Sequence, residues 1–178
     1  MNAISLLKQQ TLSAHKWTHK LIKDIPLDRW EDIPEGSITN VSWQIGHLII
    51  SEHYNNVLSI RGKVPVIFEK IPLRTYVGLF TMGTQASQIV GEIKPSLLLE
   101  NLHFIQDQSL QSLDELSVDS LDEPIVPTKR EHPIANTKVG VLSWNVQHIL
   151  WHCGQLASLK RALLNRPSFS SKPQVNKS

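Results

Sequence analysis

Two histidines four residues apart are the clearest sign of chemistry in this chain. His148 and His152 lie in an apolar run without a helix breaker, residues 144–156, which predicts one buried helix. Both imidazoles share one face of that helix and can bind a single ion, because a four-residue step advances only about 40° around the axis. A third histidine, His47, lies in a second apolar helix, residues 42–50. Three neutral imidazoles would leave a coordination position open, as in catalytic metal sites.

The alternative interpretation is that these histidines are ordinary core residues. A histidine on an apolar helix face is more often a hydrogen-bonded core residue than a ligand. The helical faces favour a site, because His47 is in line with Trp43 and Tyr54, and the other two are in line with Trp144. A buried imidazole without a partner costs a few kcal/mol, and a shared metal would satisfy all three at once.

Polar residues one turn away from the histidines are candidates for a supporting role. Gln155 follows His152 by three residues on the same face, and Gln44 and Ser51 flank His47 on either side. Such groups commonly orient a metal ligand. The alternative is that each is a polar residue that only lines a cavity.

Other residues with reactive or permissive side chains have simpler interpretations. Cys153 points about 100° away from the His152 face, so we expect a small core residue rather than a ligand. Gly154 is expected to allow close approach of a neighbouring segment. His15 and His19 form another pair at helical spacing, but they lie on the lysine-bearing flank of the first helix, and we expect them to be solvated. No role is assigned to three further histidines: His53, His103 and His132.

Four segments with helical periodicity predict an all-α protein. They span residues 4–23, 41–60, 95–113 and 137–165. Asn40 is a candidate N-cap for the second helix, and Gly62 a candidate end. About thirty residues separate the second and third helices, which implies a long crossover and a four-helix bundle of up-down-down-up topology. The run 64–68 is short and ambiguous between helix and strand.

Composition limits the number of domains and the class of partner. The 178 residues, 40% of them hydrophobic, predict a single domain over residues 1–166, followed by a disordered tail over 167–178. The net charge is +2 with scattered basic residues, so we expect no nucleic-acid partner. The single cysteine excludes an intramolecular disulfide, and no apolar run is typical of a signal peptide or a membrane span. A cytoplasmic protein is the expectation.

Tryptophans and one basic pair could shape a pocket around the metal. Trp43, Trp144 and Trp151 are expected mainly to fill the core, although any of them could wall an apolar pocket. Lys129 and Arg130 could meet an anionic substrate, but a solvated loop is the simpler interpretation. The fourth helix is apolar on its second face as well, which predicts either a central position in the bundle or a homodimer.

The histidine motifs resemble a known family. Trp43-x2-Gly46-His47-Leu48, followed about a hundred residues later by His148-x3-His152-Cys153-Gly154-Gln155, is similar to the DinB superfamily of bacterial metal-binding four-helix bundles. The likeness extends over residues 4–165. It implies that His47, His148 and His152 bind a divalent metal. Some members of the family are thiol S-transferases or thiol-dependent isomerases, and many have no known activity.

The leading functional hypothesis is a metal-dependent enzyme. A divalent ion at the three histidines would activate a low-molecular-weight thiol or a water, and the resemblance implies thiol transfer first and hydrolysis second. Zinc or nickel is the expected metal. Iron and manganese are further candidates, because imidazole ligands bind several divalent ions. The alternative is a non-catalytic metal-binding or sensing bundle. No side chain stands out in the sequence as a general base.

Overall fold

The protein is all-α, as predicted from its periodicity. The computed structural model describes residues 2–128 and 131–165, and within these ranges there is no strand, only one isolated bridge between Pro124 and Thr137. The helices are α1 (Ala3–Ile22), α2 (Val41–Glu52), α3 (Ser59–Arg61), α4 (Pro65–Lys70), α5 (Leu73–Phe80), α6 (Pro95–Asp114) and α7 (Lys138–Leu164). The predicted tail, residues 167–178, and the Lys129–Arg130 pair lie outside the described residues.

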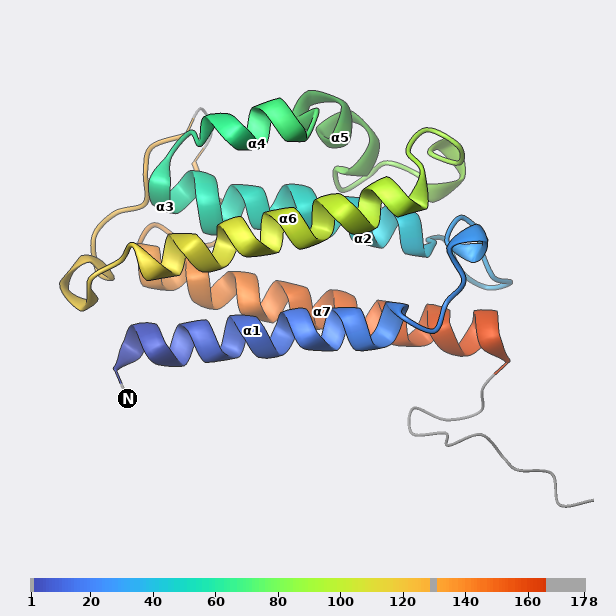
Figure 1. The fold of residues 1–178 in the computed structure, drawn as a ribbon, viewed down its shortest axis with the longest axis horizontal. Coiled ribbons are helices and arrows are strands. Elements are labelled where there is room, and N and C mark those ends of the chain that lie inside the picture. Colours follow the sequence, from blue (N-terminus) through green and yellow to red (C-terminus); the bar gives the residue numbers. More distant parts are fainter. Residues whose placement is uncertain (1, 129–130, 166–178) are drawn as a thin grey trace, which may run out of the picture.

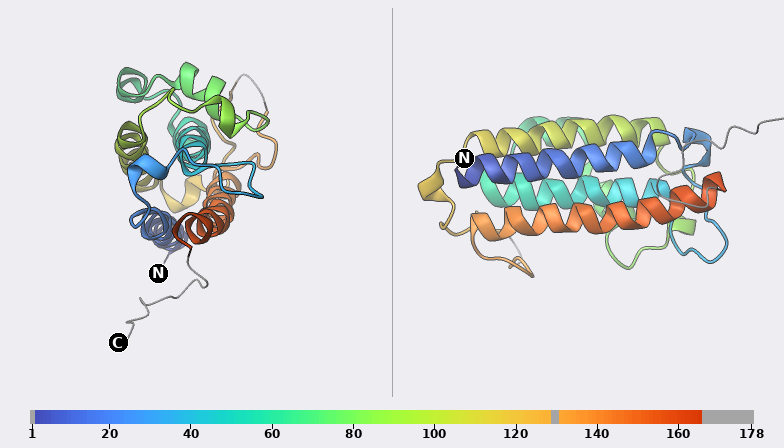
Figure 2. Two further views of the ribbon diagram at one scale, coloured as in Figure 1. Left: turned by 90° about the vertical axis from the view of Figure 1, so that its right-hand side faces the viewer. Right: turned by 90° about the horizontal axis from the view of Figure 1, so that it is seen from below.

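Long helices lie side by side and enclose the core (Figure 1). Helix α1 packs against α7 and α6, and α2 packs against α6 and α7. In Figure 1, α1 and α7 run in one direction and α2 and α6 run in the other. Viewed from the end in Figure 2, α4 and α5 lie outside this group, on the side of α2. None of the described helices combines the length and the apolar character that crossing a bilayer requires.

The crossover between α2 and α6 is partly helical. Residues 65–68 of the ambiguous run 64–68 belong to helix α4, which begins at Pro65 with Val64 as its N-cap, so these residues form a helix and not a strand. Helix α5 packs on α2, with the fully buried Phe80 against Gly46, and the fully buried Tyr76 accepts a hydrogen bond from Asn101 of α6. This packing explains why so long a connection stays ordered against the bundle, and it brings Phe80 to the candidate site.

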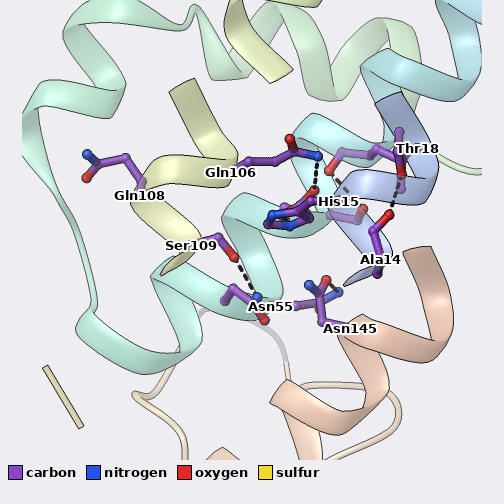
Figure 3. Close-up of polar contacts among 12 residues, drawn as sticks. Ala14, His15, Thr18, Asn55, Gln106, Gln108, Ser109 and Asn145 are labelled. Atoms are coloured by element: carbon purple, nitrogen blue, oxygen red, sulfur yellow. Dashed lines mark hydrogen bonds and ion pairs between the residues drawn. The ribbon is translucent and has the colours of Figure 1, made fainter. Parts of the chain in front are cut away.

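The second predicted helix has the predicted ends but an irregular middle. The side chain of Asn40 accepts a hydrogen bond from the backbone N–H of Trp43 at 2.8 Å, and Gly62 ends α3 with a φ of 76°. Between α2 and α3, residues 53–58 form a π-helical turn. Such wide turns re-aim side chains, and here two amides enter the core. Asn55 donates to Asn145 (Figure 3), and Asn56 donates to Ser109.

Two expectations about individual positions are wrong. Helical periodicity puts Trp17 on the same side of the first helix as Leu7 and Leu21, which predicts a core residue, yet Trp17 is 46% exposed, and the Lys20 ammonium lies over its ring. Gly154 is exposed, and a Cβ there would meet no atom within 4 Å, so no neighbouring segment packs closely against it.

Most of the second apolar face of α7 is covered within the chain. Its buried residues are Val146, Ile149, Cys153 and Ala157, and α7 makes extensive contact with α1. The central position of the helix accounts for these residues, whereas Leu150 on the same face is 46% exposed, and the homodimer stays a prediction.

Candidate metal centre

Three histidines from two helices converge at one point of the bundle. His47 projects from α2, and His148 and His152 project from α7. One ring nitrogen from each lies within 4.8 Å of the others. The ring centroids are 4.5 to 5.3 Å apart. The structure thus brings together the three residues that the sequence singled out, in an arrangement that could bind a metal ion.

The orientation of His47 is fixed by a backbone carbonyl. His47 Nδ1–H donates to the carbonyl oxygen of Phe80 at 2.8 Å, and a carbonyl can only accept. Its Nε2 therefore carries the lone pair. Gly46 makes this contact possible, because a Cβ at that position would lie 2.4 Å from the Phe80 ring. Trp43 stacks on the His47 ring at 5.0 Å, with the two planes 8° apart.

The orientation of His152 is fixed by the side-chain amide of Gln44. Gln44 Nε2 donates to Thr39 Oγ1 at 3.0 Å and to Gln155 Oε1 at 2.7 Å. Its Oε1 is therefore the acceptor for His152 Nδ1–H, at 2.5 Å. This bond leaves His152 Nε2 with its lone pair available, the outer-shell arrangement common among metal-binding histidines.

The spacing between the two α7 histidines fits a shared cation. His148 Nε2 lies 3.1 Å from His152 Nε2. Two nitrogens each bound at about 2.1 Å to one ion lie roughly 3.0 to 3.4 Å apart in octahedral or tetrahedral geometry. His148 Nδ1 is buried, with no partner among the described residues, so this ring is held by packing rather than by a second hydrogen bond. The donor set is neutral nitrogen throughout, which suits zinc, nickel or iron.

The histidines are held in the form that coordinates metal. Burial, reinforced by the neighbouring His47, lowers the pKa of His148 to about 4. Burial together with His148 and His47 lowers the pKa of His152 to about 3. Burial also lowers the pKa of His47, against the opposing effect of its bond to Phe80. All three are neutral at pH 7, and only neutral imidazole can donate to a metal.

The site opens to a pocket of about 880 Å³. The pocket lies between α2, α7, the segment 33–39 and the segment 82–87. Trp43 and Trp151 both line it, and Trp151 is 65% exposed, so the expectation that it fills the core is wrong. A ligand in the pocket can reach all three histidines, which are among its lining residues.

The predicted supporting residues differ in their placement. Gln44 and Gln155 form the hydrogen-bond chain to His152, whereas Ser51 donates to Leu48 in its own helix and does not line the pocket. Cys153 lies in the core, as expected. Sequence reasoning missed the Phe80 carbonyl. The only signal for it was the glycine before His47, which marks a close approach without naming the partner.

A second histidine cluster corrects the expectation for α1. His15 is 5% exposed, and its Nε2 donates to Glu52 Oε2 at 2.8 Å. Gln106 donates to the other Glu52 oxygen at 3.4 Å and accepts from His19 at 2.7 Å (Figure 3 shows His15 and Gln106). His19 also stacks on His103. The lysines nearby misled the sequence argument, because the buried face of α1 is wide enough to include His15.

Together, these features define a helical protein with a candidate three-histidine metal centre at an open pocket. A profile of the DinB superfamily matches residues 10–156, and the chain belongs to this superfamily. A solved structure, the "conserved protein of locus from Enterococcus faecalis", is similar in fold, with a TM-score of 0.69 and 16% sequence identity. That similarity covers 93% of this chain and 99% of the other. The search of curated proteins finds no match.

Proposed function

We propose that this protein is a metal-dependent enzyme whose centre is built from His47, His148 and His152 on an up-down-down-up four-helix bundle. The observation that carries the proposal is the convergence of the three ring nitrogens at the wall of an open pocket. No Asp, Glu or Cys lines this pocket among the described residues, so no fourth protein ligand of those types stands beside the histidines. Zinc or nickel is the proposed ion, with iron or manganese as alternatives.

The residues around the centre orient the metal ligands and leave the charge of the ion available for its reaction. A divalent ion would act as a Lewis acid and lower the pKa of a thiol or a water entering the pocket. Gln44 and the Phe80 carbonyl hold two of the rings with Nε2 directed to the site. Because all three ligands are neutral, they do not offset the charge of the cation.

Thiol transfer is the proposed reaction, and hydrolysis is the second candidate. The thiol would lose its proton, its sulfur would bond to an electrophilic carbon, and the leaving group would depart with the bonding electrons. The described pocket residues include no carboxylate and no lysine, so we propose that the proton passes to solvent rather than to a dedicated base. A non-catalytic metal-binding bundle would need no pocket at the ion, and the pocket therefore favours an enzyme.

Cobalt substitution tests this proposal. Sulfur entering the coordination sphere of cobalt gives an intense charge-transfer band, so the visible spectrum of the cobalt protein is expected to change when a small thiol is added. The His152→Ala variant is expected to give no such change, and Cys153→Ser is expected to respond like the wild type because that side chain lies in the core. A spectrum that ignores every thiol and anion would instead support the non-catalytic alternative.

A further inference from the structure

The pocket beside the three histidines contains no fixed charge. None of its described lining residues is Asp, Glu, Lys or Arg. A charged group on a part of the ligand that lies away from the ion would therefore find no side chain of opposite charge on the pocket lining.

Most polar groups in the pocket are already bonded to other parts of the protein. Thr84 Oγ1 accepts from Trp43 Nε1 at 2.8 Å, and Ser37 Oγ donates to the Thr39 carbonyl at 2.9 Å. Gln44 and Gln155 are bonded to each other at 2.7 Å. Because these groups already form hydrogen bonds within the protein, the pocket surface that a ligand would contact is mainly apolar.

Large hydrophobic side chains are exposed around the pocket. They come from three separate segments and have high exposed fractions: Ile33 38%, Ile38 93%, Met82 85% and Trp151 65%. Single exposed hydrophobic residues need no explanation, but four that surround one pocket are typical of a binding site for an apolar ligand.

We propose that the substrate of this site is a thiol with an uncharged, apolar body, such as an aryl or alkyl group, rather than a charged peptide-like thiol. The inference rests on the proposed function, because the metal centre would take the sulfur while Ile38, Met82 and Trp151 contact the body. A carboxylate at the far end of the body would lie beside these apolar side chains rather than at the ion, and no lining side chain offers it an opposite charge.

A matched pair of thiols tests this inference with the cobalt-loaded protein. Benzyl mercaptan and 4-(mercaptomethyl)benzoate differ by one carboxylate, and spectral titration gives the affinity of each. We expect the uncharged thiol to bind about tenfold or more tightly. Trp151→Ala is expected to weaken the binding of benzyl mercaptan several-fold. Trp17 is an exposed tryptophan of α1 outside the pocket, so Trp17→Ala is expected to leave this affinity unchanged.

A variant that adds a positive charge at the pocket tests the preference between the two thiols further. Ile38→Lys alters a side chain that is 93% exposed, and it is expected to narrow or reverse the preference by attracting the carboxylated thiol. Equal affinities in the wild type, or tighter binding of the carboxylated thiol, would overturn the inference while leaving the open metal centre intact. Failure of both thiols to change the spectrum would remove the proposed function and this inference together.

Discussion

Two histidine clusters occupy the same bundle, and they differ in the groups that surround them. Each includes a pair at helical spacing, His148 and His152 on α7 or His15 and His19 on α1. The α1 pair meets a buried carboxylate, Glu52, directly and through Gln106. The α7 pair contacts His47, the Gln44 amide and the Trp144 ring, has no carboxylate bonded to it among the described residues, and faces a pocket.

The difference shows that partners, rather than spacing, decide what a histidine pair does. In the α1 cluster, Glu52 supplies the negative charge and accepts the hydrogen bonds, so the network is closed within the protein. In the α7 cluster, His148 Nε2–H donates to the Nε2 lone pair of His152, and a cation that replaced this proton could bind all three rings. One cluster stabilises the fold, and the other is suited to bind an ion.

The largest expected effect comes from breaking the closed cluster. His15→Ala leaves the fully buried Glu52 with only a long bond to Gln106, and the loss of one partner of a buried pair costs about 3 to 5 kcal/mol in the free energy of unfolding. Urea denaturation measures this loss. The double variant His15→Leu/Glu52→Leu removes both partners and is expected to recover part of it. A loss below about 1 kcal/mol in His15→Ala would show that the pair does not hold the helices together.

Acidification is expected to act on the α7 cluster in the metal-free protein. In the folded protein, the pKa of His148 is lowered to about 4 and that of His152 to about 3, whereas in the unfolded chain each is about 6.5. Between pH 6.5 and 4 the unfolded state binds protons that the folded state does not, so the free energy of unfolding falls as the pH falls. Urea midpoints across this range check the slope, and His148→Leu is expected to reduce it. A midpoint that rises on acidification would contradict the lowered pKa values.

Two glycine variants give the smallest effects, and of opposite sign. Gly46→Ala places a Cβ against the Phe80 ring and is expected to cost about 1 to 3 kcal/mol, and to weaken metal binding by displacing the carbonyl that holds His47. Gly154→Ala meets no atom within 4 Å, and in a helix interior it is expected to stabilise by about 0.5 to 1 kcal/mol. Thermal unfolding measures both. Equal shifts in the two variants would show that the contact with Phe80 is not tight.

Local patterns predict the parts of this molecule that depend on neighbours in sequence. The N-cap at Asn40, the end at Gly62 and the shared face of His148 and His152 all follow from spacing along one helix. The convergence of His47 with the α7 pair could be anticipated from the motif. These features need no knowledge of which residue lies across the bundle.

Features that depend on contacts between distant segments could not be predicted in this way. The burial of His15 depends on Glu52, which is thirty-seven positions away, and the tautomer of His47 depends on a carbonyl thirty-three positions away. The exposure of Trp151 depends on how the segments 33–39 and 82–87 leave the pocket open. A hydrophobic pattern records which face is apolar, but it does not record which polar partner that face meets.

Metal analysis of protein purified without an affinity tag tests the central contrast most directly. Wild-type protein is expected to carry about one divalent ion per chain, His148→Ala and His152→Ala are expected to lose most of it, and His19→Ala is expected to keep it, with helicity checked by circular dichroism in each case. Full occupancy in both α7 variants, or loss of the ion in a folded His19→Ala protein, would contradict the assignment of the metal centre to His47, His148 and His152.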